Sequence, residues 1–84
     1  MKVSILIPLF NEQNTVIKIL NKINFEIKSL KNFDFEIIVI NDGSKDNSLI
    51  LLQENSELYS KLISYDKNHG KGYALRKGFK EATG

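Results

Sequence analysis

The segment "IIVINDGSKDNS", from Ile37 to Ser48, joins an apolar run to a polar turn and decides how the chain folds. Its first four residues are β-branched and apolar, which is typical of a parallel strand that is buried on both faces. Asn41, Asp42 and Gly43 follow at once, so this strand leads into a carboxylate beside a glycine. Asp42 can stabilise a turn or bind a ligand, and the segment alone does not decide between these roles.

Apolar segments on either side predict two more strands. They lie at Val3–Pro8 and Lys61–Tyr65, before and after the strand predicted at Phe35–Ile40. We expect Pro8 to end the first strand, because proline has no N–H to donate to a sheet.

Helical periodicity fills the intervals between the strands. Apolar residues recur every three or four positions from Val16 to Leu30 and predict one helical face, made of Val16, Leu20, Ile23, Ile27 and Leu30. Asn11 is the predicted N-cap of this helix, and Glu12 is expected in its first turn, where the helix dipole favours negative charge.

Two more helices are predicted further along the chain. One runs from Leu49 to about Glu57, with Ser44 or Asp46 as its N-cap. The last spans Tyr73–Ala82, with Leu75, Phe79 and Ala82 expected on its core face. Gly78 costs about 1 kcal/mol relative to alanine in mid-helix, so we expect close packing at that position.

The predicted element order is β-α-β-α-β-α, which is half of a doubly wound α/β sheet. Helical crossovers imply parallel strands joined by right-handed connections. Ligands of such sheets bind beyond the carboxyl ends of the strands. Three loops are expected to converge there, at Pro8–Glu12, Asn41–Asp46 and Asp66–Gly72.

A length of 84 residues predicts at most one small domain, and we expect residues 1–84 to be an incomplete one. The chain is 42% hydrophobic and 26% charged, as in ordinary soluble proteins. It has no cysteine for a disulfide, and His69 is its only histidine, which argues against zinc. A net charge of +2 gives no argument for nucleic acid. No segment predicts a membrane span or a signal peptide, so we expect a cytoplasmic location.

The "GKG" triplet at Gly70–Gly72 has two interpretations of equal weight. Its backbone amides and Lys71 can approach a phosphate, or the triplet is a flexible turn with a solvated lysine. Neither of two known phosphate motifs fits. Leu75 stands where the dinucleotide-binding fingerprint requires its third glycine, and Gly72 follows Lys71 where a P-loop requires Ser or Thr. NAD binding and ATP hydrolysis are therefore not predicted.

Other polar residues also allow a structural or a functional interpretation. Glu12 and Asp42 can form an acidic patch that faces a sugar, but no nucleophile with an orienting partner accompanies them. His69 is expected to be a turn residue. The segment Lys67–Lys80 holds five Lys or Arg and no acid. We expect a solvated helix face there, and the alternative is attraction to a phosphate-bearing ligand or an anionic membrane.

Three motifs together resemble the start of a family 2 glycosyltransferase, most closely the dolichyl- or polyprenyl-phosphate sugar transferases. They are "SILIPLFNE" (Ser4–Glu12), "EIIVINDGSKDNS" (Glu36–Ser48) and "NHGKGYALRKG" (Asn68–Gly78). Each motif alone is moderately specific, and the three in this order are highly specific. The resemblance covers almost the whole chain.

The resemblance implies a Rossmann-like, glycosyltransferase A-type α/β fold of which this chain forms the first half. It also implies transfer of a sugar from a UDP- or GDP-sugar, usually with inversion, to a polyprenyl phosphate, a saccharide or a lipid. The nucleotide-sugar-binding residues that it implies are Pro8, Phe10, Asn11, Glu12, Ile40, Asp42, Gly43, Asn68, Gly70, Lys71 and Gly72. The aspartate of the second motif contacts the base or ribose, which favours the ligand role for Asp42.

The same resemblance implies a divalent cation, Mg²⁺ or Mn²⁺, held by an Asp-x-Asp motif after the next strand. This motif, the catalytic base and the acceptor site are absent from the 84 residues. Phe10 also stands where many members have tyrosine. We therefore expect an inactive N-terminal part of an enzyme that works in the cytoplasm, at the inner face of a membrane if the complete protein contacts one.

Two alternatives belong to other classes of protein. The chain can be a stand-alone, non-catalytic α/β module that binds a nucleotide. It can also be a structural module that binds no ligand. Three strands leave open sheet edges, so we expect self-association.

Overall fold

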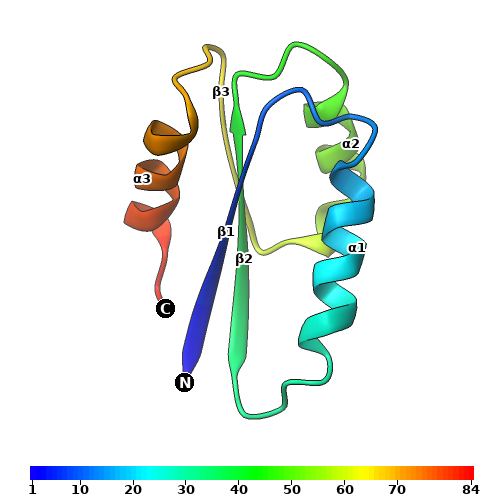
Figure 1. Ribbon diagram of the computed structural model, residues 1–84, viewed down its shortest axis with the longest axis vertical. Coiled ribbons are helices and arrows are strands. Elements are labelled where there is room, and N and C mark those ends of the chain that lie inside the picture. The colour runs from blue at the N-terminus through cyan, green and yellow to red at the C-terminus, as the bar shows by residue number, and fades with distance from the viewer.

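A three-stranded parallel sheet forms the centre of the computed structural model, which describes residues 1–84 (Figure 1). The strands are β1 (Lys2–Leu9), β2 (Asp34–Asp42) and β3 (Lys61–Tyr65), and β2 lies in the middle. The helices are α1 (Val16–Ile27), α2 (Ser48–Glu54) and α3 (Lys71–Glu81), with a short 3-10 turn, η1 (Ser56–Leu58), before β3. The predicted α/β order is confirmed.

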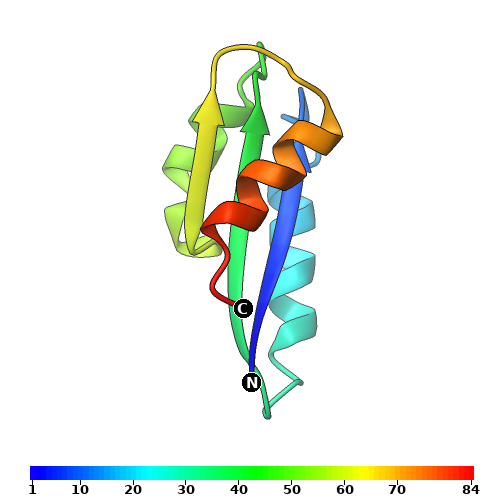
Figure 2. The same ribbon diagram turned by 90° about the vertical axis from the view of Figure 1, so that its left-hand side faces the viewer.

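All three strands run in the same direction, so their carboxyl ends meet at one edge of the sheet. β1 pairs with β2 from Lys2 opposite Asp34 to Leu9 opposite Asn41. β2 pairs with β3 up to Asp42 opposite Tyr65. The loops that follow the strands therefore share this edge (Figure 2).

Helices cover both faces of the sheet, which explains why β2 is apolar on both sides. α1 and α2 lie on one face and α3 on the other (Figure 1). Ile37 and Val39 pack toward α1 and α2, in a core with Leu20 and Leu52. The alternate residues of β2 face α3, where Ile38 and Ile40 pack against Ala74.

Two strands are longer than predicted. β1 continues past Pro8 to Leu9, because a proline is tolerated in an edge strand, whose outer side has no ladder to break. β2 continues past Ile40, because Asn41 and Asp42 pair with the ends of the neighbouring strands. Asp42 is therefore the last residue of a strand and not part of the loop that follows.

The prediction that Asn11 caps the first helix was wrong. α1 begins at Val16, after Thr15, and Asn11 lies further upstream with φ +53°. Asparagine tolerates this left-handed conformation, and its side chain pairs with a neighbouring loop instead. The predicted apolar face is present only as far as Ile27, where the helix ends, and Leu30 is exposed.

α2 ends at Glu54, three residues before the predicted end, and η1 follows. Asn47 is its N-cap residue and makes no side-chain cap bond. The carboxylate of Asp46 instead accepts the N–H of Ser48 at 2.9 Å, so Asp46 satisfies a free amide of the first turn. Ser44 has a different partner, described below.

The core face predicted for α3 was partly wrong. Ala74 and Gly78 lie against the sheet, whereas the side chain of Phe79 is 76% exposed. The close packing predicted at Gly78 is confirmed, since an added Cβ would lie 2.8 Å from Ile40 Cδ1. Small residues bring this helix close to the sheet, and the larger Phe79 cannot fit there. No helix has the length and apolar character that crossing a membrane requires.

Candidate functional site

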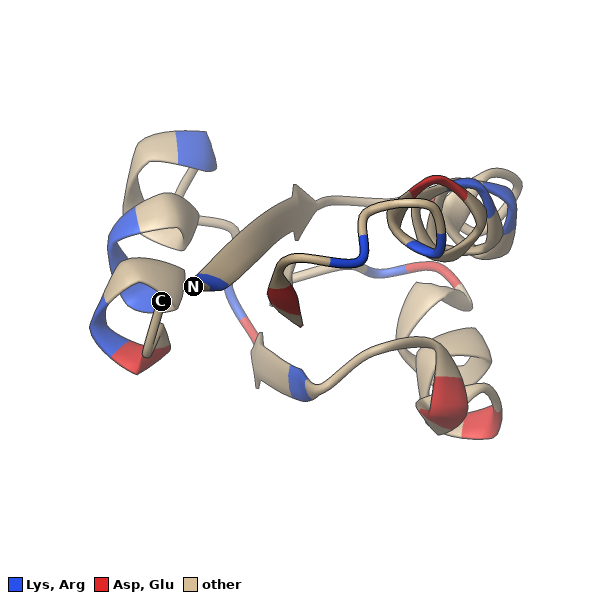
Figure 3. Cartoon of the chain, turned by 90° about the horizontal axis from the view of Figure 1, so that it is seen from below, with Lys and Arg blue, Asp and Glu red and all other residues tan.

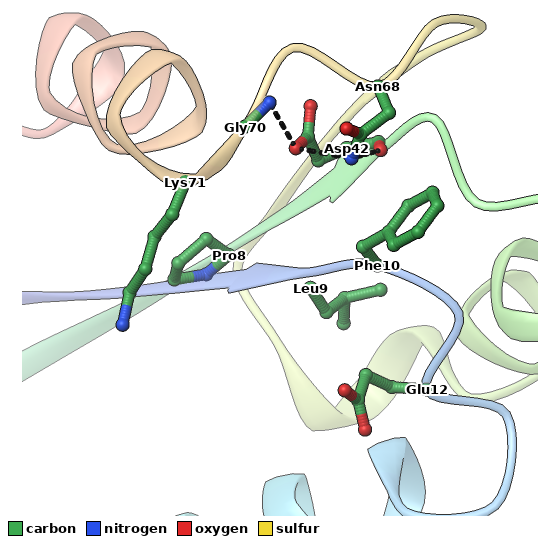
Figure 4. A pocket seen from close by; sticks show the side chains of 8 residues that line it. All are labelled: Pro8, Leu9, Phe10, Glu12, Asp42, Asn68, Gly70 and Lys71. Atoms are coloured by element: carbon green, nitrogen blue, oxygen red, sulfur yellow. Dashed lines mark hydrogen bonds between the residues drawn. The ribbon is translucent and has the colours of Figure 1, made fainter.

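The loops at the carboxyl edge of the sheet surround an open pocket of about 260 Å³ (Figure 4). Residues at the end of β1, the end of β2 and the start of α3 form its walls. They are Pro8, Leu9, Phe10, Glu12, Asp42, Asn68, Gly70 and Lys71. Segments far apart in the sequence thus meet where the α/β topology predicts a ligand.

Hydrogen bonds join the loop after β1 to the loop after β2 and to the first residue of α2. The Asn11 N–H donates to Ser44 Oγ at 2.9 Å, and Asn11 Oδ1 accepts the Lys45 N–H at 2.8 Å. The Glu12 N–H donates to Ser48 Oγ at 2.9 Å. Asn11 therefore joins two loops, and it does not line the pocket.

Asp42 anchors the loop after β3. Its carboxylate is almost fully buried, at 3% exposure. Oδ1 accepts the His69 N–H at 2.9 Å, while Oδ2 accepts the Gly70 N–H at 2.9 Å and Asn68 Nδ2 at 2.9 Å (Figure 4). Without a ligand, the Asp42 side chain stabilises a turn. That turn lies in the loop after β3, not in the loop that follows Asp42 itself.

The hydrogen bonds keep Asp42 ionised although it is buried. Burial opposes its negative charge, but the polar groups around it, among them the N–H groups of His69 and Gly70, together outweigh that effect and hold the pKa of Asp42 below its ordinary 3.8. Tyr65, opposite Asp42 in β3, has a buried hydroxyl with no hydrogen-bond partner. Burial and the Asp42 charge raise the pKa of Tyr65, so its hydroxyl stays protonated.

Gly43 makes room for the loop after β3 (residues 66–70), called the third loop below. Its φ is +69°, and an added Cβ would lie 2.3 Å from Asn68 N and 2.4 Å from Lys67 C. The backbone of residues 67 and 68 therefore crosses directly over Gly43. This crossing is what brings Asn68 within reach of Asp42.

The first turn of α3 presents free amides at the same edge. The first helical bond runs from the Ala74 N–H to the Gly70 carbonyl. The N–H groups of Lys71, Gly72 and Tyr73 make no hydrogen bond within the chain. Free amides at a helix N-terminus favour an anionic group, and the exposed Lys71 adds a positive charge beside them.

The structure brings most of the eleven predicted binding residues together around the pocket. Four lie outside it: Asn11, Ile40, Gly43 and Gly72. The side chain of Ile40 is fully buried beneath α3, so it faces the core. Leu9 lines the pocket and was not predicted. Its position directly after Pro8, at the end of a strand, was the available signal.

The acidic residues of the chain do not form a metal site. No three His, Cys, Asp or Glu side chains come close enough together to hold an ion. The carboxylate of Asp42 already accepts three hydrogen bonds, and Glu12 Oε2 accepts the Thr15 hydroxyl at 2.6 Å. These 84 residues therefore do not fit a divalent cation without further ligands.

Comparison with known proteins identifies both a family and a fold. The family model described as glycosyl transferase family 2 matches residues 4–84. The mannosyltransferase PcManGT from Pyrobaculum calidifontis, solved in complex with GDP-Man and Mn²⁺, superimposes with a TM-score of 0.81 at 21% identity, over 95% of this chain and 24% of that one. Its fold is shared.

TarS from S. aureus has the same fold in two structures. Each superimposes with a TM-score of 0.77 at 24% identity over the whole of this chain. The match covers 15% of one TarS structure and 25% of TarS 1-349. The chain thus spans a quarter or less of the solved structures that it matches, and it corresponds to one part of their fold.

Proposed function

The chain belongs to glycosyl transferase family 2, and on that premise we propose that its pocket binds the nucleotide part of a UDP- or GDP-sugar donor. One observation carries the proposal: the family-matching residues of three loops line a single open cavity at the carboxyl edge of the sheet. The mannosyltransferase that shares the fold was solved with GDP-Man, which supports a nucleotide-sugar ligand.

The walls of the pocket offer three kinds of contact that a nucleotide needs. Phe10 is 41% exposed and gives an aromatic face on which a base can stack. Glu12 supplies acceptors for ribose hydroxyls. Lys71 and the free amides of the first turn of α3 face the side where a diphosphate would bind.

Asp42 supports the ligand in two ways in this proposal. A carboxylate has about four acceptor positions, and three are occupied by the third loop. The remaining position would accept a hydrogen bond from the base or ribose, since Asp42 lines the pocket. Asp42 would thus contact the nucleotide while holding the loop that carries Gly70 and Lys71.

We extend the proposal to a longer protein of which this chain forms the donor-binding part. That protein would transfer the sugar with inversion to an acceptor such as a polyprenyl phosphate, a saccharide or a lipid. A divalent cation, Mg²⁺ or Mn²⁺, would be held by residues outside these 84, and the Mn²⁺ in the mannosyltransferase complex supports this. The metal would stabilise the leaving diphosphate. We expect the 84-residue chain alone to transfer no sugar.

A cytoplasmic membrane surface is the proposed location of the transfer reaction if the acceptor is a lipid. Basic residues are spread along α3, whose ribbon is blue at several places in Figure 3. They are Lys71, Arg76, Lys77 and Lys80. Each basic side chain near an anionic surface contributes about 1 kcal/mol to attraction. Binding of the chain to vesicles with and without anionic lipid tests this part of the proposal.

An NMR titration of the chain with UDP and with GDP, each with and without Mg²⁺, tests the nucleotide site. We expect shifts at residues 10–12, 41–43 and 68–72, and the tighter ligand identifies the base. Lys71→Ala should weaken binding by about fivefold, since one charged contact near the surface is worth about 1 kcal/mol. Lys67→Ala is the matched control, because this lysine carries the same charge in the loop just before α3 but lies outside the pocket.

Two results would overturn the proposal. One is a folded sample in which neither nucleotide shifts any resonance. The other is an equal loss of affinity in the two lysine variants, which would indicate attraction by overall charge. Detecting sugar transfer by the 84-residue chain would refute only the expectation that it is inactive.

A further inference from the structure

β2 carries two buried carboxylates on the face that it presents to α3. Alternate residues of a strand point to the same face, so Glu36, Ile38, Ile40 and Asp42 form one row. The two apolar residues in the middle pack against α3. The acidic residues at the ends of the row are 5% and 3% exposed. The nucleotide site uses Asp42 and gives no role to Glu36.

Glu36 joins four segments at the amino end of the sheet. Its Oε2 accepts Ser4 Oγ at 2.6 Å, the Thr83 N–H at 3.0 Å and Thr83 Oγ1 at 3.1 Å. Its Oε1 lies 3.2 Å from Lys61 Nζ, which also donates to the carbonyl of Glu81 at 2.9 Å. β1, β2, β3 and the residues at the end of α3 are thus connected through one carboxylate.

These contacts keep Glu36 charged. The Ser4 hydroxyl and the Thr83 N–H lower the pKa of Glu36 to about 2, against the opposing effect of burial, and Lys61 contributes further. Each of its oxygens has a partner in the chain. Glu36 is therefore charged and fully paired at neutral pH.

α3 is consequently held at three points. Asp42 anchors residues 68–70 immediately before the helix, and Glu36 anchors Thr83, two residues after its end. Between them, Gly78 lies so close to Ile40 that an added Cβ would be 2.8 Å from Ile40 Cδ1. A helix of this length is a rigid rod of about 16 Å, so fixing both ends sets its position along the sheet. Figure 2 shows α3 crossing the sheet between these two anchored segments.

We propose that Glu36 is a positioning residue for the pocket: by fixing the end of α3 it places the first turn of that helix, with Lys71, against Asp42. Glu36 does not itself contact the pocket. It acts through the helix, from the opposite end of the sheet. The expected effect on affinity rests on the proposed nucleotide site, whereas the effect on helix position does not.

The test is Glu36→Gln in the 84-residue chain, which removes the charge and keeps the size of the side chain. Far-UV circular dichroism establishes that the variant is folded. We expect its backbone amide resonances to shift at residues 70–73, and its nucleotide affinity to fall by about three- to tenfold. Glu57→Gln is the matched control, because this exposed acid lies on η1 and has no such contacts. It should change neither the amide resonances at residues 70–73 nor the nucleotide affinity.

A purely structural role of Glu36 gives a different result. The melting temperature would fall, but the resonances at 70–73 and the affinity of the folded variant would equal those of the native chain, and the proposal would be overturned. If the native chain binds no nucleotide, the nucleotide site fails, and the resonances still decide whether Glu36 positions the helix. If Glu36→Gln does not fold, Ser4→Ala is the second variant. It removes the 2.6 Å hydrogen bond to Glu36 and the acceptor of the Gly84 N–H, leaves the contacts of Glu36 with Thr83 and Lys61 in place, and must shift the same resonances.

Discussion

At Gly43 the chain has a left-handed backbone, and a neighbouring loop occupies the space where a side chain would lie. Gly43→Ala should therefore reduce the free energy of unfolding by about 3 kcal/mol or more, from backbone strain and a collision with Asn68 together. Urea unfolding of the purified variants measures this loss.

Two other glycines are controls for Gly43. Gly70 has φ +91° but no atom within 4 Å of an added Cβ, so Gly70→Ala should show only the strain, about 1–3 kcal/mol. Gly72 has neither constraint, and an alanine there should be neutral or slightly stabilising. A smaller loss for Gly43→Ala than for Gly70→Ala would contradict the crossing of the third loop over Gly43.

Asp42 should make the stability of the chain depend on pH. Asp42→Asn is expected to lower the free energy of unfolding by about 2 kcal/mol at pH 7. The three donors lose their charged acceptor, and an amide NH₂ group cannot accept the hydrogen bonds that a carboxylate oxygen accepts. The pKa of Asp42 is lower in the folded state than its ordinary 3.8. Its contribution is therefore complete above about pH 4 and is lost as the pH falls through the lower, folded pKa.

Urea unfolding at pH 7 and pH 3 measures this dependence. The difference in free energy of unfolding between the native chain and Asp42→Asn should be smaller at pH 3 than at pH 7. Asp66→Asn is the control, since this exposed acid has no hydrogen bond to lose. An equal difference between native chain and Asp42→Asn at both pH values would show that the charge of Asp42 is not what anchors the loop.

Single residues of the pocket were predictable where a strand ends, and less so where loops meet. Asp42, Pro8 and Lys71 could be placed near one edge because parallel strands share their direction. The bonds from Asn11 to Ser44 and Lys45 join positions more than thirty residues apart, and no local pattern reports them. For that reason Asn11 was predicted as a helix cap.

α3 shows how packing distance can reverse a prediction made from periodicity. The large apolar residues Leu75 and Phe79 indicated its core face. The helix lies so close to the sheet, however, that the small residues Ala74 and Gly78 occupy the space between helix and sheet. The bounds of β3 were predicted correctly, because both ends of that strand are marked by changes in polarity. The close approach of a helix depends on the partner surface, which the sequence of the helix does not contain.

Gly78→Ala tests this close approach. Alanine is the better helix former by about 1 kcal/mol, yet its Cβ would lie 2.8 Å from Ile40 Cδ1. We expect a net loss of about 1–3 kcal/mol in the free energy of unfolding, from overpacking. Ile40→Val removes the colliding methyl group. The double variant should therefore lose less free energy of unfolding than the two single variants lose together. Additive losses in the thermodynamic cycle would rule out the collision.

The whole molecule has open edges on both sides of its sheet. β1 and β3 each pair only with β2, so their outer backbone groups can accept a strand from another chain. We expect the 84-residue chain to self-associate at high concentration. Sedimentation velocity over a hundredfold range of concentration measures this, and a single monomeric boundary throughout would show that the edges are protected.

The central position of β2 has a consequence for how the protein exchanges hydrogen with water. β2 is buried from Glu36 to Asp42, lies between both other strands, and carries the carboxylates that hold α3. Its amides can be exposed only when the layers on both faces separate. They should therefore exchange with deuterium at the rate of global unfolding, whereas the outer amides of β1 and β3, which have no strand partner, should exchange much faster.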